Sequence, residues 1–165
     1  EKIDIEINCL IIDRECGAVE RAERSGIPVR RISRFSTTRV VDLQGVIPAG
    51  TDLIVLAGFM PIVSAYTCEK WNRKIINTHP SLLPKYGGKG MYGVKVQEAV
   101  MAAGEKLAGC TVHFVTNEID EGEIILQKSI VIDYKETPWQ LGGRVFIEEN
   151  KLLVEAIRMF RSGAL

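Results

Sequence analysis

The sequence predicts an α/β fold, in which a mixed, mostly parallel sheet is flanked by helices in a Rossmann-like arrangement. Two observations lead to this prediction. Short apolar runs typical of buried strands alternate with segments whose apolar residues recur at helical spacing, and a strand followed by a helix and another strand implies a parallel crossover. In contrast, the link at 116–122 suits a simple reversal, so the strands on either side of it are expected to run antiparallel.

The N-terminal segment is expected to form two strands with a helix between them. Isoleucines alternate with polar residues from Ile3 and lead into an apolar run at 9–12, which indicates a strand that becomes buried. Apolar residues at helical spacing predict a helix at 15–25, and Gly26 supplies the left-handed conformation that ends many helices. A second extended piece is expected at 27–32.

The next stretch, 33–50, is rich in serine, threonine, glycine and proline. We expect a loop there, with one helical turn at 39–44. A continuous apolar run predicts a strand at 52–57. A helix is expected at 64–71, with its first serine as N-cap, and a further apolar run predicts a strand at 74–78.

The C-terminal half is expected to hold a helix at 94–103, strands at 110–115 and 123–133, and a long final helix. The start of that helix carries three coincident signals: a threonine N-cap at Thr137, a proline at the first helical position and a glutamine three residues after the cap. Its apolar face continues to about Phe160.

Composition limits the class of protein. The chain has 165 residues, of which 46% are hydrophobic, so residues 1–165 are expected to form a single domain around one core. Lysine plus arginine and aspartate plus glutamate both number 21, and the basic residues form no long run, which argues against a nucleic-acid partner. The longest apolar runs are well short of the roughly 20 residues that cross a bilayer, so no membrane span is expected.

The cysteines and histidines argue against disulfides and metal sites. The four cysteines are scattered with no C-x-x-C pair, and a domain of this size does not need disulfides, so we expect reduced thiols in a cytoplasmic protein. The two histidines, His79 and His113, have no cysteine or second histidine at the spacing of metal ligands. We therefore expect no bound metal.

Three polar residues lie where apolar strands end: Asn77, His79 and Asp120. Side chains two apart on a strand leave the same face, so Asn77 and His79 converge if the extended conformation persists to His79. A carboxamide and an imidazole can stabilise the oxyanion formed when a nucleophile attacks a carbonyl, and a carboxylate can hold the imidazole protonated or relay a proton. Spacing alone leaves open the alternative that the histidine is a core residue and the aspartate a turn former.

The residues of three segments resemble those of the folate-dependent formyltransferases. They are Asn-Thr-His-Pro-Ser-Leu-Leu-Pro at 77–84, Gly-Cys-Thr-Val-His-Phe-Val at 109–115 and Asp-x-Gly-x-Ile at 120–124. Further similarity at 56–60 and 144–149 extends the resemblance over most of the chain. Within this family, the sequence is most similar to the branch that formylates glycinamide ribonucleotide in purine synthesis, and the expected architecture is the formyltransferase fold.

The resemblance implies direct transfer of a formyl group from the co-substrate 10-formyltetrahydrofolate to the amine of 5-phosphoribosylglycinamide, without a metal or a covalent intermediate, by a monomer or homodimer. Asn77 and His79 would stabilise the tetrahedral oxyanion, and Asp120 would position a water and His79. Thr111 and His113 would support Asp120 from behind.

The resemblance also implies two binding regions. The donor folate would contact an apolar slot and the loop that follows it, formed by Met60, Pro61, Ile62, Val63, Asn77, Asn117, Ile119 and Asp120. The acceptor would contact Met60, Pro80 and Glu149. The family often has arginine where this chain has Pro61, which leaves the contact to the folate tail open.

One departure from the family is large. Its members begin with a strand and a Gly-x-Gly-Ser/Thr-Asn loop, which cradles the phosphate of the acceptor at a helix N-terminus. This sequence enters the pattern at what resembles the second strand. We expect the intact protein to have about 20 to 30 further N-terminal residues that supply a strand, this loop and a helix.

Three other functions are compatible with parts of the pattern. A formyltetrahydrofolate hydrolase would use the same asparagine, histidine and aspartate with water as the nucleophile. A folate-binding module without catalysis would follow if the phosphate loop were absent from the intact protein. A methionyl-tRNA formyltransferase is less favoured, because it needs a C-terminal domain and a basic surface for tRNA.

Overall fold

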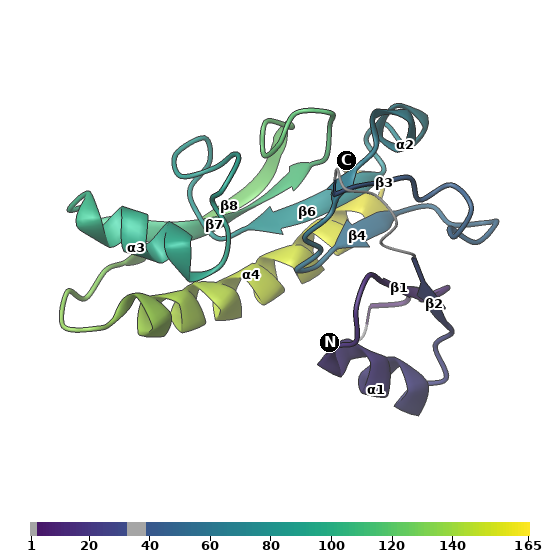
Figure 1. Cartoon of the computed structure of the whole chain (residues 1–165), viewed down its shortest axis with the longest axis horizontal. Coiled ribbons are helices and arrows are strands. Elements are labelled where there is room, and N and C mark those ends of the chain that lie inside the picture. Colours follow the sequence, from purple (N-terminus) through teal and green to yellow (C-terminus); the bar gives the residue numbers. More distant parts are fainter. Residues whose placement is uncertain (1–2, 33–38) are drawn as a thin grey trace.

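Eight strands and four helices make up the part of the chain that the computed structural model describes, residues 3–32 and 39–165. Figure 1 shows their arrangement. In chain order they are β1 (Leu10–Ile12), α1 (Gly17–Arg24), β2 (Val29–Arg31), β3 (Val40–Val41), β4 (Ile54–Leu56), β5 (Ile62–Val63), α2 (Ala65–Lys70), β6 (Ile75–His79), α3 (Val94–Ala102), β7 (Leu107–Phe114), β8 (Ile124–Val131) and α4 (Pro138–Arg161).

The largest sheet has four strands in the order β4-β6-β7-β8. Strands β4 and β6 run parallel, whereas β6 pairs antiparallel with β7, and β7 with β8. Two smaller parallel sheets, β1-β2 and β3-β5, complete the strand pairing within the described ranges. The predicted mixed strand pairing is confirmed. The three parallel pairings, β1-β2, β3-β5 and β4-β6, involve strands from the N-terminal half, and the two antiparallel pairings involve β6, β7 and β8.

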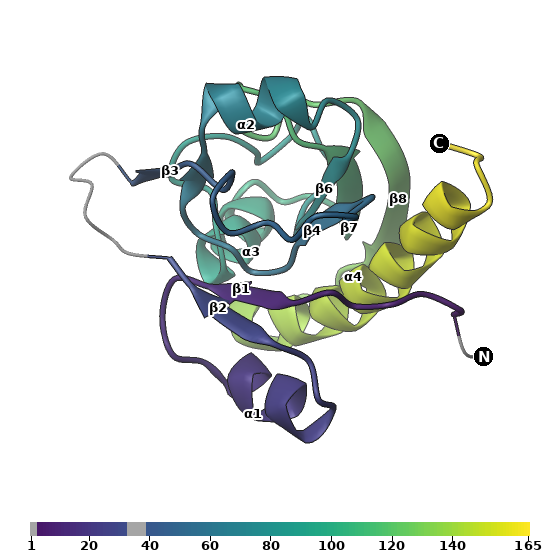
Figure 2. The same cartoon turned by 90° about the vertical axis from the view of Figure 1, so that its right-hand side faces the viewer.

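Helix α4 lies along one face of the four-stranded sheet, with α3 beside it (Figures 1 and 2). The core between these elements is apolar and buried, and its largest fully buried side chains are Ile76, Val96, Val112, Leu141 and Val145. Because side chains alternate along a strand, β6 and β7 direct their intervening residues to the opposite face of the sheet.

A second apolar cluster occupies that opposite face near β4. It contains Leu43, Ile54, Leu56, Val63, Cys68 and Ile75. Figure 2 shows α2 and α4 on opposite sides of β4 and β6. The sheet is therefore covered on both faces here, as expected for β4, which is apolar along its whole length.

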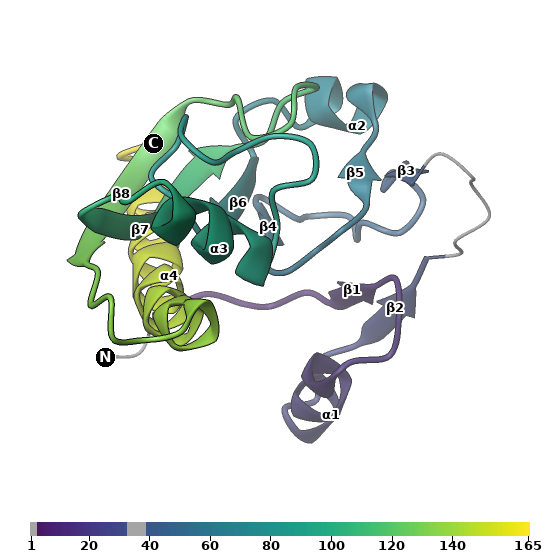
Figure 3. The ribbon, with the colours of Figure 1, turned by 60° about the vertical axis from the view of Figure 1, so that its left-hand side comes forward.

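Strands β1 and β2 and helix α1 form a small unit beside the main sheet (Figure 3). Within the described residues, β1 and β2 pair only with each other. Polar contacts connect this unit or its flanks to the rest of the chain, among them an ion pair between Asp4 and Arg161 of α4. Asn8 donates to the Thr51 hydroxyl at 3.2 Å, and Arg30 donates to the carbonyl of Val46 at 2.7 Å.

The helix starts agree closely with the sequence. The Ser64 hydroxyl accepts from the backbone N–H of Thr67, and Thr137 and Gln140 form a complete capping box, so both predicted N-caps are confirmed. The predicted strand at 74–78 is found one residue later, as Ile75–His79. This shift matters for function, because the extended conformation reaches His79 as the site hypothesis requires.

Two predictions near the N-terminus were wrong. The helical turn expected at 39–44 is replaced by β3, which pairs with the unpredicted β5. The strand expected to start at residue 3 spans only Leu10–Ile12, where it pairs with β2. Two-residue strands have no readable periodicity, and a strand needs a hydrogen-bonding neighbour that local sequence does not identify. The rest of the predicted loop, 33–38, lies outside the described residues.

Candidate active site

Strands β6 and β7 bring four polar side chains together on the face of the sheet that α4 does not cover. In the antiparallel register, Asn77 lies opposite His113 and His79 lies opposite Thr111. Their neighbours Ile76 and Val112 are buried in the core under α4. His79 and His113 are nevertheless only 4% and 2% exposed, so these polar side chains are buried and do not form a solvated surface.

Asp120 reaches this group from the loop between β7 and β8. It adopts a left-handed backbone conformation, with φ of 59°, which aspartate tolerates better than most residues. Its Oδ2 accepts a hydrogen bond from the backbone N–H of Gly88 at 2.9 Å. Gly122 closes the loop so tightly that a Cβ there would lie 1.7 Å from the carbonyl oxygen of Phe114, so only glycine fits.

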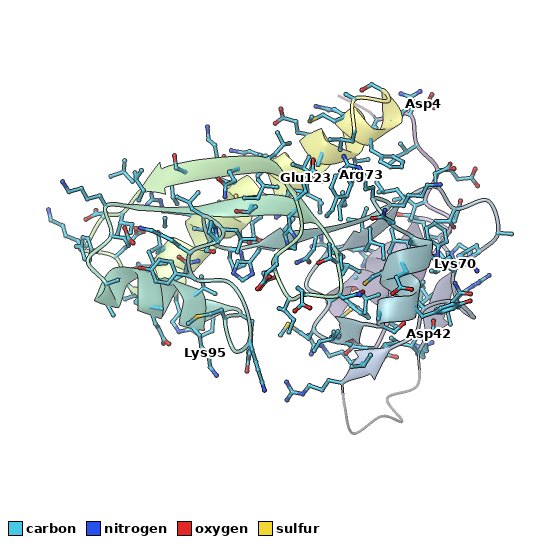
Figure 4. The ribbon with its side chains drawn as sticks, turned by 90° about the horizontal axis from the view of Figure 1, so that it is seen from above. Asp4, Asp42, Lys70, Arg73, Lys95 and Glu123 are labelled. Carbon is cyan, nitrogen blue, oxygen red and sulfur yellow. The ribbon has the colours of Figure 1, made fainter. Side chains whose placement is uncertain are left out.

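The base of this loop is held by a charged contact. Arg73 and Glu123, labelled in Figure 4, form an ion pair. The Arg73 guanidinium also lies 4.4 Å from the centre of the Phe114 ring, a geometry that favours a cation–π contact. The N–H of Phe114 donates to the carbonyl of Glu123 at 2.9 Å. These contacts hold together the two ends of the loop that carries Asp120.

The His79 imidazole has a polar neighbour at each ring nitrogen. Its Nε2 lies 2.8 Å from the backbone oxygen of Tyr86, which can only accept, so Nε2 carries the proton. Its Nδ1 lies 3.4 Å from Oδ2 of Asp120. In the protonated ring both nitrogens donate, one to Tyr86 and the other toward Asp120. The carboxylate therefore faces Nδ1 of His79 and helps to set the orientation of the ring.

Asn77 is oriented by His113. Nδ1 of His113 lies 2.8 Å from the carbonyl oxygen of Phe114, so Nδ1 carries the proton and Nε2 is free to accept. Nδ2 of Asn77 lies 3.2 Å from this Nε2. Burial lowers the pKa of His113 and favours this neutral form. One N–H of the Asn77 amide is thus used, and its second N–H remains available for a substrate oxygen.

The two residues expected to support Asp120 have other principal partners. Nε2 of His113 is 3.8 Å from Oδ1 of Asp120, longer than its contact with Asn77. The Thr111 hydroxyl donates to the carbonyl of Ser81 at 2.7 Å and accepts from the N–H of Leu83 at 3.1 Å. Thr111 therefore anchors the loop that follows His79.

That loop, 80–88, folds back over the site. The Ser81 hydroxyl donates to the carbonyl of Lys85 at 2.6 Å, and Tyr86 adopts a left-handed conformation with φ of 57°. Gly87 is packed so closely that a Cβ there would lie 3.3 Å from the Cβ of Asp120. The backbone of this loop therefore contacts both His79 and Asp120 directly.

Apart from Asn77 on β6, the residues expected to bind folate lie on two segments, 60–63 and 117–120. Met60 and Ile62 are about 40% exposed, at 40% and 38%, whereas Val63 is buried in the second core. Ile119, on the loop after β7, is also exposed, and so is Asn117. The two segments meet at α2, where the Cys68 thiol lies 3.4 Å from the carbonyl of Thr116.

The residues expected to bind the acceptor are less close together. The Pro80 carbonyl accepts from the Gln97 side chain at 2.7 Å. Glu149 lies on α4, and burial raises its pKa, although a hydrogen bond with the Thr78 side chain opposes this effect. Because Thr78 leaves the face of β6 opposite to Asn77 and His79, Glu149 approaches the strand from the other side.

Sequence reasoning missed three groups that complete the site: the carbonyl of Tyr86, the N–H of Gly88 and the side chain of Gln97. Backbone groups carry no side-chain signal in a sequence. Gln97 is 1% exposed on α3 and looks like any polar residue of an amphipathic helix. Within residues 3–32 and 39–165, no group of three or more potential metal ligands is gathered, and no helix is long and apolar enough to cross a bilayer.

Comparison with known proteins identifies the family. A model of the formyl transferase family matches residues 1–157. The chain belongs to this family. It is 36% identical over 152 residues to the chloroplastic phosphoribosylglycinamide formyltransferase of Arabidopsis thaliana, an alignment that covers 87% of this chain and 51% of the plant protein. The chain thus spans about half the length of that relative.

Solved structures of family members have the same fold. Phosphoribosylglycinamide formyltransferase from Coxiella burnetii superposes with a TM-score of 0.83 at 34% identity, over 96% of this chain and 75% of that one. A formyltetrahydrofolate deformylase from Pseudomonas syringae superposes with a TM-score of 0.77 at 26% identity, over 95% of this chain and 52% of that one. The formyltransferase fold expected from the sequence is therefore confirmed.

Proposed function

We propose that the protein transfers the formyl group of 10-formyltetrahydrofolate to the amine of 5-phosphoribosylglycinamide, a step of purine biosynthesis. The single observation that supports this most is the pairing of two donors on one face of β6. Asn77 has a second N–H free, and His79 is held beside Asp120 at 3.4 Å. The second N–H of Asn77 and the Nδ1–H of the protonated His79 ring are two donors that suit the oxyanion of a tetrahedral intermediate. The 3.4 Å separation of Nδ1 from Asp120 is longer than a full hydrogen bond, so this N–H is able to donate to the substrate.

The reaction proceeds by direct attack. The acceptor amine forms a bond to the formyl carbon, and the carbonyl electrons move to oxygen, where Asn77 and His79 stabilise the negative charge. The bond from the formyl carbon to N10 of the folate then breaks as the carbonyl re-forms. The proton lost by the amine is transferred to N10, through a water that Asp120 positions. No metal is required, and EDTA should leave turnover unchanged.

The binding regions follow from the exposed apolar side chains around the site. Met60, Ile62 and Ile119 supply apolar surface for the pterin ring, with Pro61, Val63 and Asn117 beside them. The acceptor contacts Met60, Pro80 and Glu149, the last from the α4 side of β6, next to Thr78. The thiols of Cys9, Cys16, Cys68 and Cys110 are free, and free thiols favour a reducing compartment such as the cytoplasm. We further propose that the protein acts as a single catalytic domain, as a monomer or a homodimer.

Hydrolysis of the formyl donor is the second candidate. The similarity of the fold to the P. syringae deformylase favours it, because the same donors would stabilise attack by water. The identity with that protein is 26%, against 34% for the C. burnetii transferase, and we therefore favour transfer.

One assay separates these functions. The protein is incubated with 10-formyltetrahydrofolate in the presence and in the absence of 5-phosphoribosylglycinamide, and formylated acceptor and released formate are both quantified. Transfer predicts folate turnover that depends on the acceptor, with little formate. Formate release independent of the acceptor would show a hydrolase, and folate binding without turnover would show a non-catalytic module.

A further inference from the structure

Glu105, in the turn between α3 and β7, is connected to the loop above the site. Its Oε1 accepts from the phenol of Tyr86 at 3.0 Å and from the Lys85 ammonium at 2.9 Å. Its own backbone is fixed in turn, since Tyr134 donates to the carbonyl of Glu105 at 2.8 Å. The carboxylate is 29% exposed, compared with 67% for the Lys85 side chain. Glu105 is therefore a fixed and partly buried acceptor.

Tyr86 connects this acceptor to His79. Its phenol contacts Glu105 while its backbone carbonyl accepts from Nε2 of His79 at 2.8 Å. The residue holds a left-handed conformation, with φ of 57°, which a tyrosine rarely adopts without external support. The ring is half-buried and packs against the main core. The phenol contact is thus the polar tether that keeps the Tyr86 carbonyl turned toward the imidazole.

We propose that Glu105 is a positioning residue for the proposed formyl transfer, acting through Tyr86 to fix the orientation and the proton position of the His79 imidazole. This inference rests on the proposed function only for its effect on turnover. Loss of the tether lets the backbone at Tyr86 leave the left-handed region, and Nε2 of His79 loses the acceptor that holds its proton. Asp120 then faces a ring of undefined orientation.

The direct test observes His79 itself. The chain contains two histidines, so ¹⁵N spectra of histidine-labelled protein give two imidazoles, assigned with the variant His113→Gln. We expect Glu105→Ala and Tyr86→Phe each to shift the ring nitrogens of His79 and to lower kcat by about 10- to 100-fold, with KM changed by less than about threefold. The double variant should show no further loss beyond either single one, because both remove the same contact.

Two matched variants separate positioning from general damage to the loop. Glu105→Gln keeps an acceptor for the Tyr86 phenol and should restore the His79 signals. Lys85→Met removes the ion pair but leaves the phenol contact, and should leave both His79 and kcat unchanged. The proposal is overturned if Glu105→Ala leaves the His79 signals in place, or if Lys85→Met shifts them equally. If the wild-type protein transfers no formyl group, the proposed function fails. The His79 spectra still decide whether Glu105 positions His79 through Tyr86.

Discussion

The amide nitrogen of Asn77 lies 3.2 Å from Nε2 of His113, on the neighbouring strand. This contact settles which way the amide of Asn77 points, because His113 uses its other nitrogen to donate to the carbonyl of Phe114. An unrestrained asparagine could turn its oxygen toward the substrate and repel an oxyanion. The buried imidazole prevents this, so His113 keeps the amide of Asn77 in the orientation of a donor.

The first prediction concerns this orientation. His113→Leu removes the acceptor and should lower kcat by about 10- to 100-fold while changing the KM for either substrate by less than about threefold. In a double-mutant cycle with Asn77→Ala, the two losses should be far from additive. Full additivity would mean that His113 does not act through Asn77.

The second prediction concerns stability at low pH. Burial lowers the pKa of His113 in the folded state from its ordinary value of 6.5. Above pH 6.5 both states are neutral, and below it the unfolded chain gains a proton that the buried ring resists, so the free energy of unfolding should fall. Urea denaturation at pH 7.5 and pH 5.5 measures this loss. It should be smaller in His113→Gln, and an equal loss in both proteins would contradict the prediction.

The third prediction is a conflict between stability and binding at Glu149. Burial raises the pKa of this carboxyl above its ordinary value of 4.5, so the folded state binds the proton more tightly than the unfolded chain and loses stability as the pH rises above 4.5. Glu149→Gln should therefore raise the free energy of unfolding at pH 7.5. If Glu149 contacts the acceptor, the same variant should raise the KM for 5-phosphoribosylglycinamide by about tenfold or more. A more stable variant with unchanged KM would remove Glu149 from the acceptor site.

The fourth prediction contrasts two glycines. A Cβ at Gly122 would lie 1.7 Å from a backbone oxygen, so Gly122→Ala should destabilise the protein by about 2 kcal/mol or more and disturb the loop of Asp120. Gly143, on the exposed side of α4, has nothing within 4 Å of the same position. Gly143→Ala should stabilise the protein by about 1 kcal/mol, since alanine favours the helix. Thermal denaturation decides both, and equal effects would contradict the account.

The sequence could predict those parts of the site that depend on a repeating pattern. Period-two alternation placed Asn77 and His79 on one face, and the apolar run that precedes them continues as a strand through His79. The capping box at Thr137 was likewise local and was found as expected. In each case the information lies within a few residues, so no knowledge of the remainder of the fold was needed.

Other parts could not be predicted because they depend on distant contacts. The approach of Asp120 to His79 requires the left-handed backbone at Asp120, the tight turn at Gly122 and the N–H of Gly88. No periodicity encodes these features. The pairing of β3 with β5 likewise joins two-residue strands that are separated in the chain, and neither strand has a partner until the chain folds.

The central claim is that His79, held by Asp120, stabilises the transition state of formyl transfer. The most direct measurement is the single-turnover rate of His79→Ala and Asp120→Asn with 10-formyltetrahydrofolate and 5-phosphoribosylglycinamide, together with the affinity of each variant for the folate. We predict a rate lower by at least about 100-fold in each variant, with folate affinity within a few-fold of wild type. Near-normal transfer by folded His79→Ala protein would contradict the account.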